Sequence, residues 1–142
     1  MEEVDLLSKW TDTYVSEFSY ASLDDIRIGS QRWIGSYHES DLQYIFGQPL
    51  LGLSNSLRHE NDSEVARLSM AVIKSFANYG EPKLPSYFNI TWPKYERSSK
   101  IHLELCDQPK LGKELLHDRN TSALLSALEY FDDSSSEETE AL

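Results

Sequence analysis

The chain has 142 residues, of which 39% are hydrophobic, and this length and composition suit one domain with a single core. Its 24 acidic and 13 basic residues leave a net charge of −11, which argues against non-specific binding to nucleic acid or to an anionic membrane. No apolar run is long enough for a transmembrane helix, and the acidic start shows no signal peptide.

The first third of the chain is expected to contain two short helical segments and one strand. A short helix is expected at about residues 2–9, and a strand at 13–20, where β-forming residues alternate with small or polar ones. An apolar turn or helix is then expected at 42–46, and it is expected to end at Gly47 and Pro49.

The strongest helical pattern runs from residue 63 to 79, with candidate caps at its start and Gly80 in the place of a C-terminal glycine. Alternation predicts a second strand at 101–105, with His102 at the surface. A last amphipathic helix is expected near 124–131. The residues behind these predictions are Val65, Leu68, Val72, Ile73 and Phe76 in the first helix, its candidate caps Asn61, Asp62 and Ser63, and Leu124, Leu125, Leu128 and Phe131 in the last helix.

Helices and strands interleave along the chain, which predicts the α/β class. The final residues, 132–142, contain five acids and no base, and their only apolar residues are Ala141 and Leu142. Such a segment cannot bury enough apolar surface to offset the entropy of ordering it. We therefore expect it to be a disordered acidic tail.

Candidate chemistry is sparse. Histidines stand at positions 38, 59, 102 and 117, and no pair has the spacing of a zinc site. The single cysteine, Cys106, has no partner for an internal disulfide and is followed by an acid, so an inert thiol is expected. No metal and no cofactor is implied.

His38 is different because it follows a predicted strand and precedes a predicted short helix. Ligands and catalytic residues gather on such loops in α/β folds. From the spacing alone, an ordinary loop histidine is still favoured.

The stretch around His38 resembles the loop that carries the catalytic histidine in the cholinesterase and type-B carboxylesterase family of α/β hydrolases, written roughly as W-x-G-x-x-H-G-x-E/D-[IL]-x-[FY]-[VI]-F-G-x-P. Similar blocks follow in the same order, and the matches run from about residue 13 to 131. The matching residues in this loop are Trp33, Gly35, His38, Asp41, Leu42, Tyr44, Phe46, Gly47 and Pro49, followed by the blocks 76–82, 92–95 and 101–103 and by Pro109.

The resemblance implies that residues 1–131 are the C-terminal part of an α/β-hydrolase domain, incomplete in this sequence, with His38 as the catalytic histidine. Two departures matter. Glu39 stands where the family usually has glycine, and the serine motif G-x-S-x-G is absent, although the serine precedes the histidine in this fold. We therefore expect a chain that needs a longer protein to act on an ester substrate, that is inactive alone, and that folds poorly without a partner.

Two other interpretations stay open. The chain could be a piece of a non-catalytic relative, such as an adhesion protein resembling the neuroligins. An upstream G-x-S-x-G would distinguish a catalytic parent from this non-catalytic one. It could also be a short chain that binds a partner through its tail or its last helix. In cholinesterases the C-terminal helices assist dimerisation, so Leu124, Leu125, Leu128 and Phe131 could form a dimer face, although packing on the chain's own core is favoured.

Three N-glycosylation sequons begin at Asn61, Asn89 and Asn120. They favour a parent protein that is secreted or anchored outside the cell. Asn61 has a competing interpretation, because it could simply cap the helix that follows.

Overall fold

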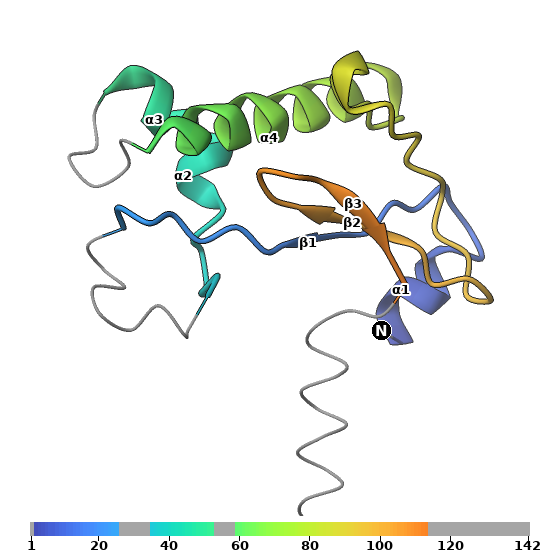
Figure 1. Ribbon diagram of the computed structural model, residues 1–142. Coiled ribbons are helices and arrows are strands. Elements are labelled where there is room, and N and C mark those ends of the chain that lie inside the picture. Colours follow the sequence, from blue (N-terminus) through green and yellow to red (C-terminus); the bar gives the residue numbers. More distant parts are fainter. Residues whose placement is uncertain (1, 26–34, 53–58, 114–142) are drawn as a thin grey trace, which may run out of the picture.

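The computed structural model describes residues 2–25, 35–52 and 59–113, in which a long helix lies along one face of a small sheet (Figure 1). The mixed α/β content predicted from the sequence is confirmed. The predicted last helix and the acidic tail lie outside the described residues, and no helix among the described ones is both long and apolar enough to cross a membrane. The elements in chain order are α1 (Glu2–Leu7), β1 (Ser16–Phe18), α2 (Leu42–Ile45), α3 (Gln48–Leu51), α4 (Glu60–Tyr79), the 3₁₀ turn η2 (Ser86–Phe88), β2 (His102–Leu105) and β3 (Lys110–Gly112).

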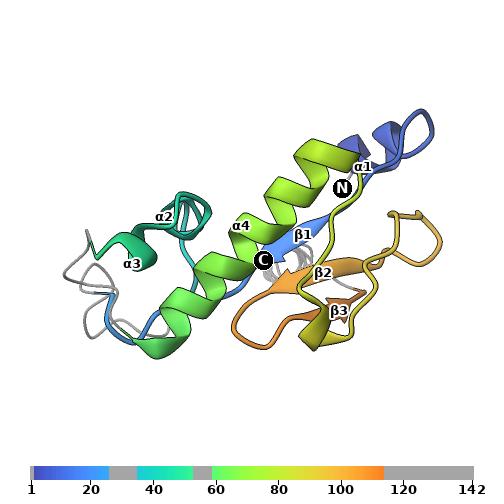
Figure 2. The same ribbon diagram turned by 90° about the horizontal axis from the view of Figure 1, so that it is seen from above.

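The sheet has the order β1-β2-β3. Strand β1 pairs parallel with β2, and Glu17 stands opposite Glu104. Strand β3 runs antiparallel to β2 and was not predicted. A parallel pair needs a long crossover connection, and here the connection includes α2, α3 and α4 (Figure 2).

Helix α4 begins earlier than predicted, at Glu60 rather than near residue 63. The cap is His59, whose ring Nδ1 accepts a hydrogen bond from the Asn61 backbone N–H at 3.3 Å. The helix ends at the predicted Gly80, which has a φ of 68° and donates its N–H to the Phe76 carbonyl at 2.8 Å. A left-handed residue of this kind favours glycine, because a Cβ would clash with the backbone.

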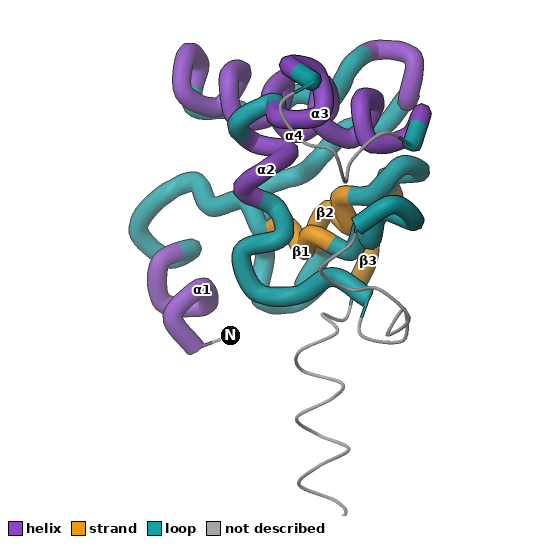
Figure 3. The backbone as a smooth tube through the Cα atoms, turned by 90° about the vertical axis from the view of Figure 1, so that its left-hand side faces the viewer, coloured by secondary structure: helices purple, strands orange, loops and turns teal. Residues whose placement is uncertain are grey.

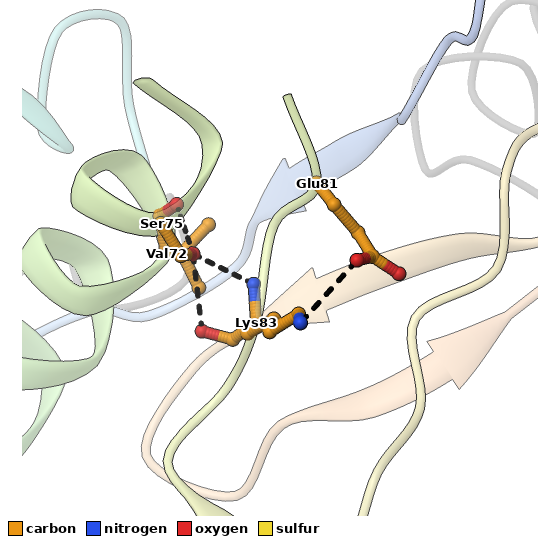
Figure 4. A network of polar contacts seen from close by, with 4 residues as sticks. All are labelled: Val72, Ser75, Glu81 and Lys83. Carbon is orange, nitrogen blue, oxygen red and sulfur yellow. Dashed lines mark hydrogen bonds and ion pairs between the residues drawn. The ribbon is translucent and has the colours of Figure 1, made fainter. Parts of the chain in front are cut away.

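The chain turns back onto α4 directly after Gly80 (Figure 4). The Ser75 hydroxyl donates to the Val72 carbonyl at 2.9 Å and accepts the Lys83 backbone N–H at 2.7 Å. The Lys83 ammonium also lies 3.4 Å from the Glu81 carboxylate. These contacts hold the segment that leads toward β2 against the end of α4.

One face of α4 packs on the sheet, with α2 and α3 beside it (Figure 3). Three residues of the predicted helical pattern are buried there, namely Val65, Leu68 and Val72. Ile73 and Phe76 belong to the same sequence pattern but are 45% and 50% exposed. The other core residues are Tyr20, Tyr44, Ala66, Trp92, Leu103 and Leu105.

Two further predictions, on the first strand and on Pro49, need correction. The strand expected at 13–20 is regular only over β1, because only this part pairs with β2. Pro49 does not end the helical segment at 42–46. It lies in the first turn of α3 instead, where its missing N–H and fixed φ are suited to a helix start.

His102 was predicted to lie at the surface, but its side chain is buried and only 1% exposed. It stands opposite Gly112 in β3, and a Cβ at position 112 would come within 2.6 Å of His102 Nε2. The prediction failed because the alternation was taken as evidence of one exposed face, whereas β2 is largely covered on both faces.

Candidate functional site

His38 lies at the tip of a tight turn. The Ser40 backbone N–H donates to the Tyr37 carbonyl at 3.0 Å, which places His38 and Glu39 in the two central positions. The His38 side chain is 95% exposed, and its Nε2 lies 3.7 Å from the Glu39 carboxylate. An exposed contact of this kind holds the ring weakly.

Glu39 has a φ of 65°. In the third position of a turn, this left-handed conformation favours glycine, because a Cβ is crowded by the neighbouring carbonyl. The resemblance described above implies glycine at this position, and glycine adopts this conformation without strain. In this chain, glutamate occupies a backbone geometry that disfavours it.

Two side-chain contacts brace the turn. The Tyr37 hydroxyl donates to the buried Asp25 carboxylate at 2.7 Å, and the hydroxyls of Ser36 and Ser40 lie 2.9 Å apart. The first contact joins the turn to the segment that follows β1. His38 therefore stands on a turn attached to the sheet, although the ring itself is free in solvent.

The strongest polar cluster of the described residues surrounds Asp62, which is completely buried at the start of α4. Its Oδ1 accepts hydrogen bonds from the hydroxyls of Tyr20 at 3.0 Å and Tyr44 at 3.3 Å. Its Oδ2 accepts from the Ser22 hydroxyl at 2.9 Å and from the His59 backbone N–H at 3.0 Å. A buried carboxylate is tolerated when donors compensate the loss of water, and here both oxygens are satisfied.

The two tyrosines of this cluster are held in the neutral, donating form. Burial raises the pKa of Tyr20, and its hydrogen bond to Asp62 raises it further. Burial also raises the pKa of Tyr44, with the Asp62 charge as the next cause. Their rings meet edge to face with centroids 5.5 Å apart, so the cluster is packed as well as hydrogen-bonded.

Two open pockets lie on the described part of the chain. One, of about 390 Å³, is found at the carboxyl ends of β1 and β2 and is lined in part by Tyr20, His59 and Cys106. The other, of about 240 Å³, lies between residues 81–84 and 90–92. His38 lines neither of them.

The remaining candidate residues are spread out. Asn61 is half-buried and donates its side-chain amide to Asp107 at 2.9 Å, whereas Asn89 is exposed in the turn after η2. Asn120 lies outside the described residues. Cys106 donates to the Gln108 carbonyl at 3.1 Å, and the described residues contain no group that could hold a metal ion.

Sequence reasoning proposed His38, which stays a prediction, and missed the polar cluster around Asp62. Asp62 was considered only as a helix cap, and Tyr20 and Tyr44 were assigned to a strand and a family motif. The available signal was an acid at the third position of a helix, which can accept the N–H of the capping residue. That signal does not reveal donors 42 and 18 residues away in sequence.

Comparison with known proteins finds sequences related to this chain. A model of the carboxylesterase family matches residues 2–123. An acetylcholinesterase from Bungarus fasciatus is 31% identical over 94 residues, which is 63% of this chain and 15% of that relative. The chain thus matches only a small part of the relative's length.

We predict that Glu39→Gly stabilises the chain. Removing the Cβ relieves a left-handed conformation, so the free energy of unfolding should rise by about 1 kcal/mol, reduced somewhat by the greater entropy of unfolded glycine. Urea unfolding followed by tryptophan fluorescence would measure this. Glu39→Gln is the matched control, because it removes the same charge and keeps the Cβ; equal shifts in both variants would contradict the prediction.

We also predict that stability falls as the pH rises above about 10, where tyrosines of the unfolded chain ionise. Folded Tyr20 and Tyr44 keep their protons to higher pH, so the unfolded state binds fewer protons there and is favoured. Tyr44→Phe should flatten this fall by up to about 1.4 kcal/mol per pH unit. Urea midpoints between pH 8 and about pH 11.5 test this, with the exposed Tyr79→Phe as control; an unchanged slope in Tyr44→Phe would refute it.

Proposed function

Because the chain belongs to the carboxylesterase family, we propose that it supplies the histidine of a serine ester hydrolase, with His38 as the general base. The serine and the acid of the triad would come from a part of the protein outside this sequence. The observation that supports this role is the placement of His38. Its side chain is 95% exposed on a braced turn, on the segment that leads into α2.

The reaction would use the two ring nitrogens of His38 in different ways. Nε2 would take the proton of the serine hydroxyl while the serine oxygen attacks the ester carbonyl. The bond to the alcohol oxygen would then break, and the same nitrogen would return the proton to this leaving group. A water molecule would repeat the sequence, releasing the carboxylic acid and restoring the serine.

The ring also needs an acid at Nδ1 to fix its tautomer and orientation. Glu39 does not suit this role, because its carboxylate lies 3.7 Å from Nε2, the nitrogen that would face the serine. In the proposed enzyme the orienting acid therefore comes from elsewhere. Approach of the serine would require the Glu39 side chain to turn away, which its exposure permits.

Without the rest of the enzyme, these 142 residues should have no useful esterase activity. The sequence contains no G-x-S-x-G and no glycine-rich oxyanion loop. Losing the nucleophile and the oxyanion donors removes most of the rate enhancement of such enzymes. An imidazole alone offers only background hydrolysis.

Glu39 favours a second candidate function, that of a non-catalytic cholinesterase-like binding or adhesion protein. Glutamate is less favourable than glycine in the left-handed conformation of this residue, and its carboxylate lies 3.7 Å from His38 Nε2, where a serine would have to bind. The serine motif discriminates the two candidates. A parent that retains G-x-S-x-G supports the hydrolase, and one that lacks it supports the binding protein.

We further propose that the parent protein is extracellular, because the exposed Asn89 begins a sequon in an accessible turn. Asn61 is less suited to carry a glycan, since its side-chain nitrogen is hydrogen-bonded to Asp107.

In a natural form of the protein that also carries the serine, His38→Ala should lower kcat by at least about 10⁴-fold. Loss of turnover measured with a chromogenic ester would show this, and His59→Asn is the control because asparagine can still cap α4. The 142-residue chain alone should show no turnover that an organophosphate blocks. Full activity of His38→Ala, or organophosphate-sensitive turnover by the chain alone, would overturn the proposal.

When the protein is made in a secretory cell, Asn89→Gln should remove a glycosidase-sensitive mass increment, whereas Asn61→Gln should leave it unchanged. Thr91→Ala is the matched variant, because it destroys the same sequon and keeps the asparagine. Electrophoresis before and after glycosidase treatment is the measurement. A glycosidase-sensitive increment as large as that of the unchanged chain, in both Asn89→Gln and Thr91→Ala, would disprove glycosylation at Asn89; a smaller increment that remains would come from another sequon.

A further inference from the structure

We propose that Asp62 is the positioning residue for His38: one buried carboxylate fixes both sides of the segment that carries the histidine. The catalytic consequence rests on the proposed function of His38. The structural part, that Asp62 holds the His38 turn in place, can be tested without any esterase activity.

The carboxylate binds residues on both sides of His38 in the sequence. Tyr20 and Ser22 come before the histidine, and Tyr44 follows it, yet their three hydroxyls converge on Asp62 at 2.9 to 3.3 Å. Asp62 itself belongs to α4, which comes later in the chain than all of them. Its position at the start of a 20-residue helix that packs on the sheet gives the cluster a rigid base.

Two chains of contacts lead from this cluster to the turn. On one side, the Ser22 hydroxyl accepts the Asp24 N–H at 3.2 Å, and the neighbouring Asp25 accepts the Tyr37 hydroxyl at 2.7 Å. On the other side, Tyr44 lies in α2, whose first residue, Leu42, donates its N–H to the Glu39 carbonyl at 3.2 Å. Both paths end at the residues that flank His38.

A charged acceptor is needed because each oxygen of Asp62 receives two donors. Hydrogen bonds to a carboxylate are stronger than neutral ones, and a buried donor that loses its acceptor is costly. Asparagine keeps the size of the side chain but replaces one acceptor oxygen with a donor. In Asp62→Asn the new NH₂ group faces hydroxyl or N–H donors that in the unchanged chain have a carboxylate oxygen as acceptor. These donors lose their hydrogen bonds, and the segment should loosen.

The first test measures backbone hydrogen exchange by mass spectrometry in the 142-residue chain. Asp62→Asn should speed exchange in peptides covering residues 35–45 by at least about tenfold, while residues 72–79 and β2 change little. Tyr20→Phe and Tyr44→Phe keep the rings and remove one hydroxyl each. They replace Asp62→Asn in this test if that variant does not fold. Tyr87→Phe is the matched control, because its hydroxyl makes a 3.3 Å bond to Glu64 on the exposed surface.

Faster exchange confined to residues 35–45 supports the proposal. Unchanged exchange there in Asp62→Asn, or in both cluster tyrosine variants, overturns it. An equal increase in every peptide also overturns it, because Asp62 would then contribute only to overall stability.

The second test uses a natural form of the protein that carries the serine and shows turnover that depends on His38. There Tyr44→Phe and Tyr20→Phe should lower kcat by about ten- to a hundredfold, as expected for a misplaced base, with KM nearly unchanged. Unchanged kcat overturns the proposal. If no turnover depends on His38, the proposed function fails, and the exchange result alone decides whether Asp62 positions the turn.

Discussion

The described structure depends on the burial of one negative charge. Asp62 has no contact with water, and four donors from β1's continuation, α2 and the cap of α4 make that burial possible. The bonds join segments that the hydrophobic core brings near one another but cannot fix in register, because apolar contacts are not directional. A fully satisfied polar cluster of this kind specifies a single arrangement.

The same cluster explains how an exposed histidine can have a defined position. The His38 ring touches little, and the Glu39 conformation weakens rather than strengthens the turn. The turn is held by hydrogen bonds to its flanking residues: Tyr37 binds Asp25 on one side, and the first residue of α2 binds Glu39 on the other. In the proposed enzyme this division leaves the ring free to meet a serine and an acid supplied by other parts of the protein.

The surface of α4 is also consistent with a larger parent. Met70, Ile73 and Phe76 are between 42% and 50% exposed, although their spacing is that of a buried helix face. The matched stretch covers 15% of the acetylcholinesterase relative, so in the proposed longer protein further elements could pack on this face. A periodic pattern of hydrophobic residues indicates a face suited to burial, and the structure shows that these three side chains stay partly exposed within the described residues.

The sequence by itself determined the family, the α/β content, the extent of α4 to within one turn, its glycine end and the candidacy of His38, because motif order and helical periodicity are local properties. Tertiary structure decided the rest. Whether Ile73 and His102 are buried depends on what packs against them. Ile73 follows the helical pattern but is 45% exposed, and the surface position predicted for His102 was wrong. Nothing in the sequence indicated the cluster around Asp62. The hydroxyl donors of this cluster lie 18, 40 and 42 residues from Asp62 in the sequence and meet it only after the chain has folded. Long-range hydrogen bonds leave no periodic trace in a single sequence. Only the folded arrangement reveals that Asp62 binds these distant donors in addition to the N–H of the residue that caps α4.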